Sequence, residues 1–592
     1  MTVKHLIFSL IILFLLDSAS LIAQETFLPH YMTEAEKALY PSYQPPLSER
    51  SNPYPPTDPV RGMAEWEKLD GIMIAWTSYY DILVRIIDYA QEEGKVYIVC
   101  QDSNQVKNYL TYQGVPLKNL KFLIEDFDTI WCRDYGPWSA YSEIDDSHYI
   151  IDWIYNRPRP SDDTVPAAFA DFMGLEAFEA TQSPNDLVHT GGNLMVDGHG
   201  TAFSSELILE ENSSKSEAEI DDIMNDYLGV KRYIKMPVLP YDEIHHIDMH
   251  MKLLDEETLL VGEYPSGVAD GPQIEANLQY VLDNFTTCYG NPYRVVRIPM
   301  PPDASGLYPD QGGDYRTYTN SVIINKTVIV PTYEEQYDST ALRIYREAMP
   351  GYHIVGIDCN EIITSLGAIH CITKEVGAPD PIFIAHNPLR HATVTEKAVD
   401  VYAQIKNNSG IDSALTFWST DTSAGFTRLS MQAVNNDSFY TQIPAQAAGT
   451  TVFYYLRAVS QNGNRINKPP VAPAGLFSYT VQSPSAVTWD SRPAPHTFRL
   501  FQNTPNPFRA GYTGANTSIR YQLASAGHVK LSIYNLLGQK INTLYEGYQT
   551  QGIKRITWNG QNDYGSPVSA GVYFYCLKTE HGIFSRKMII IP

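Results

Sequence analysis

The sequence predicts an α/β fold over residues 61–386, followed by two β modules. In the first region, a pattern of strand, turn, strand, amphipathic helix and strand recurs several times. Beyond about residue 387 the helical periodicity ends, and short β-rich runs alternate with polar turns. Units of this size cannot each bury their own apolar faces, so we expect the repeats to share one core around a pseudo-symmetry axis. A site at that axis would draw its residues from several repeats.

The start of the chain is typical of an exported protein. Residues 1–23 combine Lys4, a short apolar run and Ala23 before Gln24, which predicts a secretory signal peptide. No later run reaches the roughly 20 apolar residues of a membrane span, so we expect a mature protein without a transmembrane segment, secreted or held at the cell surface. Residues 24–60 are rich in Pro, Tyr and Ser and predict an extended lead-in or propeptide that contributes no core.

The repeats are clearest in three stretches, which cover residues 191–236, 245–298 and 315–357. In the first of them, a predicted helix with one apolar face lies between strands. That face is formed by Ile220, Ile223, Met224, Tyr227 and Leu228. The beginning of the region, residues 71–100, follows the same order of strand, helix and strand.

Two modules without helices follow. Residues 387–485 alternate β-rich runs with polar turns, which predicts an immunoglobulin-like sandwich. Residues 495–592 predict a second β-sandwich, with the motif Gln502-Asn-Thr-Pro-Asn-Pro-Phe and a basic, then apolar tail from Arg586. This module resembles the C-terminal sorting domain of bacterial type IX secretion cargo. The resemblance implies passage through the outer membrane, the type IX secretion machinery as a partner, and removal of the module on arrival.

Composition argues against some classes of function. The formal net charge of −24 argues against nucleic-acid binding, for which a basic stripe is expected. The charge is compatible with attraction of a cationic substrate, although the solubility of an exported protein is the simpler explanation. The six cysteines show no CxxC pair and no metal-finger spacing. Neither a disulfide framework nor a zinc site is therefore predicted, and some of the cysteines should be free thiols.

Three polar residues and one thiol stand out in the repeat region. A strand over residues 245–250 would point His246 and Asp248 into one space. Asn320 enters a later strand, and Cys371 lies in a short apolar stretch. Taken alone, the histidine could be a satisfied buried residue and the thiol an inert one. Their order, each at the start of a strand in a repeating fold, indicates a shared site instead.

A further carboxylate lies among aromatic residues. Asp134 belongs to the run Trp131-Cys132-Arg133-Asp134-Tyr135-Gly136-Pro137-Trp138, where an unpartnered charge would be costly to bury. A carboxylate in this setting suits a planar cation, because it accepts the hydrogen bonds of the cation while a ring covers its face. An internal pair of Asp134 with Arg133 would explain the pattern equally well. Cys132 brings a second thiol close to this position, and the sequence leaves it open as an alternative nucleophile.

These motifs carry a resemblance to a known family. They are Ala64-Glu-Trp-Glu, the run from Trp131 to Trp138, Gly191-Gly192-Asn193, His246-Ile-Asp248, Tyr318-Thr-Asn320 and Ile369-His-Cys371. Over residues 60–385 the chain resembles the guanidine-modifying enzymes of the agmatine deiminase and bacterial peptidylarginine deiminase branch. The resemblance implies a five-bladed, pseudo-symmetric α/β propeller of ββαβ repeats.

One loop distinguishes between members of that family. Arg157 and Arg159 lie one residue apart in the Pro-stiffened stretch 154–160 and project donors that a carboxylate can accept. In the secreted peptidylarginine deiminases, such a pair binds the C-terminal carboxylate of a substrate that ends in arginine. Nothing in agmatine needs these donors, so the pair favours arginine-containing peptides and proteins as partners. The plain alternative is a pair of surface charges in a loop.

The resemblance also implies a mechanism. Asp134 and Asp248 would grip the guanidinium nitrogens at a substrate site lined by Trp131. Cys371 would attack as a thiolate and form a covalent thiouronium intermediate. His246 would give a proton to the departing ammonia and then activate the water that releases citrulline.

The remaining expectations concern cofactors and alternatives. By the same resemblance, Asn320 would orient the thiol. The chemistry requires no metal or organic cofactor, and no calcium loop of the EF-hand type is present, although structural cations in loops are compatible with the sequence. Two other functions stay open. One is an exported deiminase of agmatine or free arginine, and the other is a non-catalytic surface binding protein.

Overall fold

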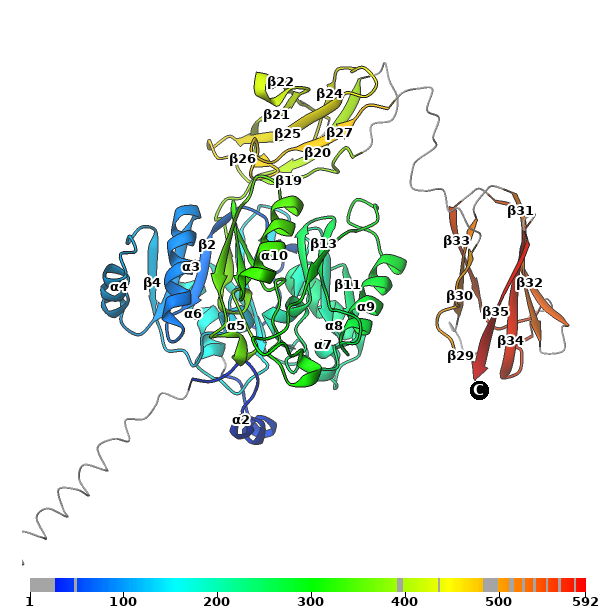
Figure 1. Ribbon diagram of the computed structural model, residues 1–592, viewed down its shortest axis with the longest axis horizontal. Helices are drawn as coiled ribbons and strands as arrows, with labels where there is room; N and C mark the ends of the chain where they lie inside the picture. Colours follow the sequence, from blue (N-terminus) through cyan, green and yellow to red (C-terminus); the bar gives the residue numbers. More distant parts are fainter. Residues whose placement is uncertain are drawn as a thin grey trace, which may run out of the picture. The chain divides into compact units, whose positions relative to one another are not determined.

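The computed structural model describes most of the chain after residue 26 (Figure 1). The described residues are 27–46, 50–390, 398–434, 437–482, 499–509, 516–523, 527–535, 539–549, 552–562, 566–579 and 582–591. The predicted signal peptide, residues 1–23, lies outside them. The described residues contain no helix that is long and apolar enough to cross a membrane. The chain divides into two compact units, one within residues 1–482 and the other within residues 483–592.

Residues 60–377 confirm the predicted α/β class. In the described part of this region, five small sheets repeat one topology: an antiparallel pair of strands, a helix, and a third strand parallel to the second. Sheet by sheet, the strands are β5 (Trp138–Ser142), β6 (His148–Tyr155) and β7 (Glu176–Ala180); β9 (Met195–Val196), β10 (Thr201–Ser205) and β11 (Arg232–Met236); β12 (Met251–Asp255), β13 (Thr258–Glu263) and β14 (Arg294–Pro299); β15 (Val322–Ile324), β16 (Thr327–Thr332) and β17 (His353–Asp358); and β18 (Lys374–Gly377), β2 (Leu69–Ala75) and β3 (Lys95–Cys100). In the same order, the helices are α6 (Val165–Met173), α8 (Glu217–Leu228), α9 (Gly271–Asn284), α10 (Glu335–Ala348) and α3 (Tyr80–Glu93).

One of these sheets joins the two ends of the region. Its strand β18 comes from the end of the region yet pairs with β2 at the beginning, with Lys374 opposite Met73 and Val376 opposite Gly71. The region therefore closes on itself, which brings the segment that carries Cys371 beside the first strands. Shorter elements complete the sheets and their connections; they are β1 (Val60–Gly62), β4 (Leu120–Ile124), β8 (Val188–His189), α4 (Ser103–Tyr112), α5 (Cys132–Tyr135) and α7 (Leu207–Glu211).

Helix α8 shows why these segments are helical. The Ser216 side chain accepts from the backbone of Glu219 while the Glu219 side chain accepts from the backbone of Ser216, a capping box that satisfies both donors. The helix ends at Gly229, whose φ of 68° is a left-handed conformation that favours glycine. Its buried residues are the five that the sequence predicted, Ile220, Ile223, Met224, Tyr227 and Leu228.

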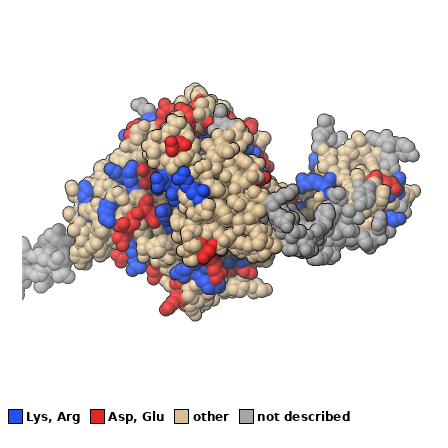
Figure 2. All heavy atoms as spheres, turned by 90° about the horizontal axis from the view of Figure 1, so that it is seen from above, with Lys and Arg blue, Asp and Glu red and all other residues tan. Residues whose placement is uncertain are grey.

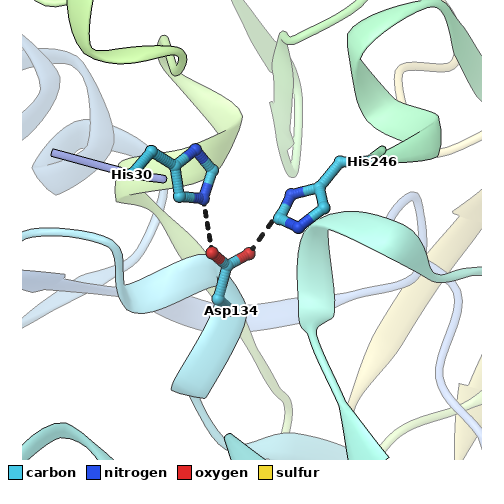
Figure 3. A group of neighbouring side chains, drawn as sticks. All are labelled: His30, Asp134 and His246. Atoms are coloured by element: carbon cyan, nitrogen blue, oxygen red, sulfur yellow. Dashed lines mark hydrogen bonds and ion pairs between the residues drawn. The ribbon is translucent and has the colours of Figure 1, made fainter. Parts of the chain in front are cut away.

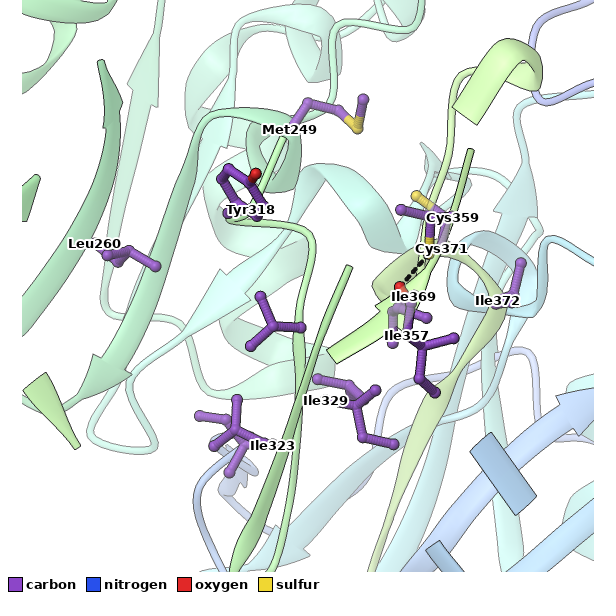
Figure 4. Packing of buried hydrophobic residues seen from close by; sticks show 14 of the residues in the cluster. Met249, Leu260, Tyr318, Ile323, Ile329, Ile357, Cys359, Ile369, Cys371 and Ile372 are labelled. Carbon is purple, nitrogen blue, oxygen red and sulfur yellow. Dashed lines mark hydrogen bonds between the residues drawn. The ribbon is translucent and has the colours of Figure 1, made fainter. Parts of the chain in front are cut away.

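Four of the five sheets share one core, whereas the sheet of β5, β6 and β7 packs in two other apolar clusters. The largest cluster of buried apolar side chains contains residues from four of the five sheets, such as Ile74 of β2, Phe203 of β10, Leu260 of β13 and Ile329 of β16. Cys371 lies in this cluster among isoleucine side chains (Figure 4). All six cysteines lie in described residues and are free thiols.

Two β regions follow. Residues 383–480 form two antiparallel sheets that share one apolar core, with side chains such as Val401 and Leu456. Ion pairs of Arg390 with Glu257 and of Lys468 with Glu256 join this region to the α/β region. One sheet contains β19 (Phe383–Ala385), β20 (Val399–Lys406), β24 (Ser438–Ile443) and β23 (Gln432–Ala433), and the other contains β22 (Thr427–Ser430), β21 (Ile411–Ser419), β25 (Thr451–Ser460), β26 (Arg465–Lys468) and β27 (Phe477–Thr480).

The described part of the second unit consists of two sheets around a separate core, which includes Tyr521, Leu531 and Tyr575. The first sheet contains β28 (Arg499–Leu500), β30 (Thr517–Leu523) and β33 (Gly552–Trp558). The second contains β29 (Phe508–Arg509), β35 (Gly582–Ile591), β34 (Gly571–Thr579), β31 (Gly527–Asn535) and β32 (Lys540–Gln549).

Charged side chains of both signs are interspersed on the face of the first unit that Figure 2 shows. The net charge of −24 is not gathered into one continuous acidic surface on that face. This distribution favours a general effect on solubility over a single cation-binding surface as the explanation of the charge.

The lead-in segment, described over residues 27–46 and 50–60, differs from its prediction. It contains helix α2 (Glu34–Leu39) and a 3-10 turn at Tyr40–Ser42, and it buries the side chain of His30 completely. Helix α2 lies at the end of the α/β region away from residues 383–480 (Figure 1). The expectation of a segment that contributes nothing to the interior is therefore wrong at His30. The buried side chains of His30 and Glu36 are polar and leave no apolar period in the sequence, so composition did not reveal them.

Candidate active site

Cys371 is buried in a 3-10 turn rather than on a strand. This turn, His370–Ile372, precedes β18 and brings the thiol to Asn320, whose Nδ2 donates to Sγ at 3.1 Å. Asn320 Oδ1 accepts from the backbone N–H of His370 at 3.0 Å, so one amide side chain holds both the turn and the thiol. Burial, together with the nearby charges of Asp248 and Asp134, raises the pKa of the Cys371 thiol well above its usual value. The thiol is therefore protonated in this state.

Asp134 lies on the short helix α5 and is almost completely buried. The backbone N–H of Gly192 donates to its Oδ1 at 3.1 Å, and Nδ1 of His246 lies 3.7 Å from the same oxygen. A Cβ at Gly192 would lie 2.4 Å from that Nδ1, so the close approach needs glycine. Burial raises the pKa of Asp134, but the hydrogen-bonded imidazole of His30 brings it below its usual range. The carboxylate is therefore ionised.

His246 and Asp248 do not lie on a strand, and this part of the prediction is wrong. His245 has a φ of 57°, after which the chain forms a 3-10 turn at Ile247–Met249, before β12 begins. The alternation of side chains along a strand does not apply in such a turn. Both side chains are nevertheless buried close to the other candidates. Burial lowers the pKa of His246 to about 4, so its imidazole is neutral at pH 7.

A chain of buried groups that the sequence analysis missed holds Asp248. Its Oδ2 lies 2.7 Å from His370 Nδ1, and His370 Nε2 lies 3.1 Å from Glu65 Oε2. Lys252 Nζ donates to the same Glu65 carboxylate at 2.8 Å. Among the described residues, Asp248 Oδ1 has no hydrogen-bond partner although it is buried, so it is free to accept from a substrate. Glu65 and His370 both belong to motifs that carried the family resemblance, which was the available signal.

Arg133 does not pair with Asp134, so that alternative is wrong. Its Nη1 donates to Glu375 Oε2 at 2.5 Å, and its Nε donates to the carbonyl of His370 at 3.2 Å. The Arg133 guanidinium therefore supports the turn that carries the thiol, and the Asp134 carboxylate is left to other partners.

Cys132 lies in a different environment from Cys371. Its thiol donates to the carbonyl of Met73 at 3.5 Å and packs in a separate apolar cluster. Burial raises its pKa to about 12. No hydrogen bond joins it to Asn320 or to any other candidate among the described residues, which favours Cys371 as the nucleophile.

The lead-in segment fills the space beside Asp134. His30 Nε2 is hydrogen-bonded to Asp134 Oδ2, and Figure 3 shows His30 and His246 approaching this carboxylate from two sides. The His30 ring stacks on Trp131, with ring centroids 4.4 Å apart and planes 12° apart. Trp131, which we predicted to line the substrate site, thus has an imidazole of the same chain against its face.

Arg157 and Arg159 are buried beside this segment and are not surface charges, so the plain alternative is wrong. Arg157 Nε donates to the carbonyl of His30 at 3.2 Å. Arg159 Nε donates to Glu36 Oε1 at 2.7 Å. Both guanidinium groups therefore bind oxygen acceptors from the lead-in segment.

Comparison with known proteins decides the family. The sequence profile of the Porphyromonas-type peptidyl-arginine deiminases matches residues 61–377 of the 592, more than half of the chain. The chain belongs to this family. The profile of the FlgD Ig-like domain matches residues 508–582, so the second unit contains an Ig-like domain.

Individual relatives of this deiminase cover the same part. A Vibrio parahaemolyticus protein named "putative agmatine deiminase" is 26% identical over 360 residues, which are 53% of this chain and 96% of the relative. The agmatine deiminase of Medicago truncatula is 25% identical, with 53% and 95% covered. The solved structure of another protein, also named "putative agmatine deiminase", matches 55% of this chain and 98% of its own chain. The identity is 21% and the TM-score is 0.50. That similarity shows a shared fold.

Membership of the family makes the chain a deiminase, a hydrolase that acts on guanidino groups. The site suits such a substrate. Two carboxyl groups, from Asp134 and Asp248, lie near the thiol of Cys371, and a neutral imidazole is supplied by His246. Trp131 offers a flat face for a planar cation. Each side chain comes from a turn or short helix between strands of different sheets, as expected for a site shared by several repeats.

His30, Asp134 and His246 also form a group that could hold a metal ion. Their ligand atoms lie within 4.8 Å of one another, and two imidazoles with a carboxylate are ligands that Zn²⁺ accepts. In the structure, however, Asp134 and His30 are bonded directly to each other (Figure 3). We therefore interpret the group as a hydrogen-bonded ion pair and assign no step to a metal.

Proposed function

We propose that this deiminase hydrolyses the guanidinium group of peptidyl arginine, preferentially C-terminal arginine, and releases citrulline and ammonia. The observation that carries the proposal is the position of Arg157 and Arg159. Both are buried beside the site and donate to a carbonyl and a carboxylate, which come from His30 and Glu36. A substrate that ends in arginine offers a carboxylate in the same surroundings, where charge-assisted hydrogen bonds are strong.

Binding would prepare the nucleophile. Asp134 and Asp248 would accept hydrogen bonds from the guanidinium while Trp131 covers its face. The negative charges of these two carboxyl groups contribute to the raised pKa of the Cys371 thiol, after burial as the main cause. A cation bound between them offsets those charges and favours the thiolate, which is the attacking form. The N–H of Asn320 at 3.1 Å from Sγ stabilises that thiolate further.

The chemical steps would proceed through a covalent intermediate. His246 accepts the proton of Cys371, and Sγ forms a bond to the central guanidinium carbon. His246 then gives this proton to one terminal nitrogen, the C–N bond breaks, and ammonia leaves a thiouronium on the cysteine. Neutral His246 next takes a proton from water, and the oxygen adds to the same carbon. Finally the C–S bond breaks, the sulfur regains a proton from His246, the hydroxyl proton of the adduct passes to solvent, and neutral citrulline is released.

A panel of four substrates tests the proposal. They are a peptide with C-terminal arginine, its C-terminal amide, a peptide with internal arginine, and agmatine. We expect the first to have the highest kcat/KM for citrulline or carbamoyl formation. Amidation should lower it about tenfold to a hundredfold, because hydrogen bonds to a charged group contribute about 1.5–3 kcal/mol.

Two arginine variants test which residues set the preference for C-terminal arginine. Arg157→Ala and Arg159→Ala should lower turnover of the C-terminal-arginine peptide relative to that of agmatine, and agmatine turnover itself should not fall. Arg343→Ala, which removes an exposed guanidinium paired with Glu347 on α10, is the matched control and should behave as wild type. Equal losses on all four substrates would contradict the role of the arginine pair.

Deimination of agmatine is the second candidate, because the Vibrio parahaemolyticus and Medicago truncatula relatives carry that name. If agmatine is much the best substrate in the panel, this candidate replaces the first. No turnover of any of the four compounds by wild type and by the variants that free the site, described below, would favour the non-catalytic surface protein.

We extend the proposal to the rest of the chain. The five sheets of one topology and the closure through β18 support a five-bladed propeller over residues 61–386. The composition of residues 1–23 supports a signal peptide, and the motifs of residues 495–592 support a type IX sorting domain. Deleting residues 495–592 should retain the protein inside the outer membrane, as cell fractionation would show.

A chelator should leave turnover unchanged if no metal or other cofactor is required.

A further inference from the structure

We infer that residues 27–39 form an internal pseudosubstrate that closes the site until the segment is displaced or cut away. The inference rests on the proposed function, because it identifies the occupied space with the place of a substrate arginine. Four features carry it: the imidazole of His30, the backbone around it, the path of the preceding residues, and the anchor at Glu36.

His30 presents a planar cation to Asp134. Its Nδ1 lies 2.6 Å from the carbonyl oxygen of Leu366, and its Nε2 is bonded to the Asp134 carboxylate. Both partners are acceptors, so both ring nitrogens must donate, and an imidazole with two N–H groups is positively charged. The ring also stacks on Trp131, as a planar cation does. These are the contacts proposed for the guanidinium of a substrate.

The backbone of the segment occupies the place of a substrate chain. The His30 carbonyl accepts from Arg157 Nε at 3.2 Å, and the Pro29 carbonyl accepts from Arg159 Nη2 at 2.7 Å. In a substrate that ends in arginine, the terminal carboxylate follows the arginine as this carbonyl follows the His30 side chain. His30 therefore stands in the register of the arginine to be modified.

The residues before His30 follow an aromatic wall. The Leu28 carbonyl accepts from Trp131 Nε1 at 3.1 Å, and the Phe27 ring packs edge-on against Tyr79 with centroids 4.8 Å apart. A cavity of about 450 Å³ lies beside Phe27 and Leu28 and is also lined by Trp76. Residues that precede a substrate arginine would lie along this wall once the segment has left.

One buried ion pair anchors the segment. Glu36 Oε1 and Arg159 Nε lie 2.7 Å apart, and although burial raises the pKa of Glu36, its bonds to Arg159 lower it overall. The rest of α2 is mostly exposed, as Lys37 and Glu34 are. Helix α2 is thus held mainly through Glu36, while the preceding residues are held by the backbone N–H of His30, which donates to the Ser365 carbonyl at 3.1 Å, and by Phe27, which packs against the main apolar core.

While the segment is in place, the site is closed. Cys371, Asp134 and His246 are each at most 1% exposed, and His30 is completely buried above them. A substrate therefore has no path to the thiol in this state. The segment acts as an intramolecular competitor, and a tether keeps its local concentration in the millimolar range.

The test uses the full mature chain and three variants. His30→Ala removes the cation, and His30→Ala with Glu36→Gln also weakens the anchor. Lys37→Ala is the control, because this lysine lies at the surface of α2 in a pair with Glu34. Two quantities are measured: kcat and apparent KM for a C-terminal-arginine peptide, and the rate at which chloroacetamidine, a small amidine electrophile, alkylates Cys371, followed by mass spectrometry.

Because the segment competes with substrate, we expect the double variant to have an apparent KM about tenfold to a hundredfold below wild type at unchanged kcat. Alkylation of Cys371 should accelerate by a similar factor, and Lys37→Ala should match wild type. A synthetic peptide of residues 27–39 should slow the alkylation of the double variant, and the same peptide with alanine in place of His30 should not.

Two results separate this inference from the proposed function. Equal KM and equal alkylation rates in wild type and the double variant would overturn the inference, even if arginine peptides are turned over. Faster alkylation in the double variant without turnover of any guanidinium compound would uphold the closed site and contradict the proposed function. A change in kcat alone would indicate a structural role for His30 and would also overturn the inference.

Discussion

The two carboxyl groups of the site are held in different ways. Asp134 is bonded to His30, which the lead-in segment supplies, whereas Asp248 lies 2.7 Å from His370, which belongs to the turn before β18. His370 is fixed in turn by the carboxylate of Glu65, whereas the second ring nitrogen of His30 is bonded to the backbone carbonyl of Leu366. The partner of Asp134 can therefore be exchanged, whereas the partners of Asp248 are part of the fold. We call the surroundings of Asp134 the exchangeable side and those of Asp248 the fixed side.

The surrounding charges explain why the partner of Asp134 can leave while the groups behind Asp248 stay in place. Behind Asp248, buried ion pairs join Glu65 to Lys252 and Arg133 to Glu375, at 2.8 and 2.5 Å. Removing one member would strand a buried charge, which is strongly destabilising. Beside Asp134, a leaving cation can be replaced by an arriving one, so the buried charge stays balanced. The exchangeable side is thus the side on which a substrate cation competes.

The largest expected effect tests the thiol that lies between these two sides. Cys371→Ala should lower turnover at least about a thousandfold, as loss of a nucleophile does in other hydrolases. Cys132→Ala, the matched control, should keep turnover within a few-fold, because that thiol donates only to the carbonyl of Met73. Citrulline formation measures both. Retained turnover in Cys371→Ala would mean that the two carboxyl groups serve a different nucleophile.

The second expected effect is on stability. Arg133→Met leaves Glu375 with one buried partner fewer and should lower the free energy of unfolding by about 3–5 kcal/mol. Arg157→Met, on the exchangeable side, loses hydrogen bonds to two carbonyls and should cost only about 1–2 kcal/mol. Urea unfolding at pH 7 compares them. Similar losses in both variants would remove the distinction between a fixed and an exchangeable side.

A third prediction concerns activity on the fixed side. Glu65→Gln removes the charged acceptor of His370, so Asp248 loses its position, and kcat/KM should fall about tenfold to a hundredfold. On the exchangeable side, the change in kcat/KM should have the opposite sign, because loss of His30 should raise it. Glu67→Gln is the control, because this nearby acid pairs with Arg61 and not with the site. Unfolding midpoints of the variants show that each is assayed in its folded state.

The smallest expected effect is on pH dependence. Burial lowers the pKa of His246 to about 4, from about 6.5 in an unfolded chain, so the folded protein binds fewer protons than the unfolded one between these values. This contribution to stability is present above pH 6.5 and is lost as the pH falls toward 4. Wild type should therefore lose about 1–2 kcal/mol more than His246→Gln between pH 7 and pH 5 in urea unfolding. Equal losses would mean that the imidazole is not buried in its neutral form.

Sequence patterns predicted the elements whose signal repeats over many residues. The apolar face of α8 is buried as predicted, because five residues at helical spacing leave little choice of face. Site residues could be named from their motifs, but their local geometry could not. The strand rule failed for His246 and Asp248, since the left-handed φ of His245 begins a turn that no alternation records. His30 contacts Asp134 across 104 positions through a single side chain, and no periodicity marks such a contact.

Glu36 uses its two carboxylate oxygens for different purposes. Oε1 accepts from Arg159, and Oε2 accepts from the backbone and hydroxyl of Thr33, which completes the capping box that begins α2. A helix of six residues is not stable alone in water, so α2 should unravel when Arg159 releases Glu36. Release then gains chain entropy, and return requires the helix to nucleate again. We therefore expect opening of the site to be coupled to unfolding of α2, so that the open fraction should rise with temperature.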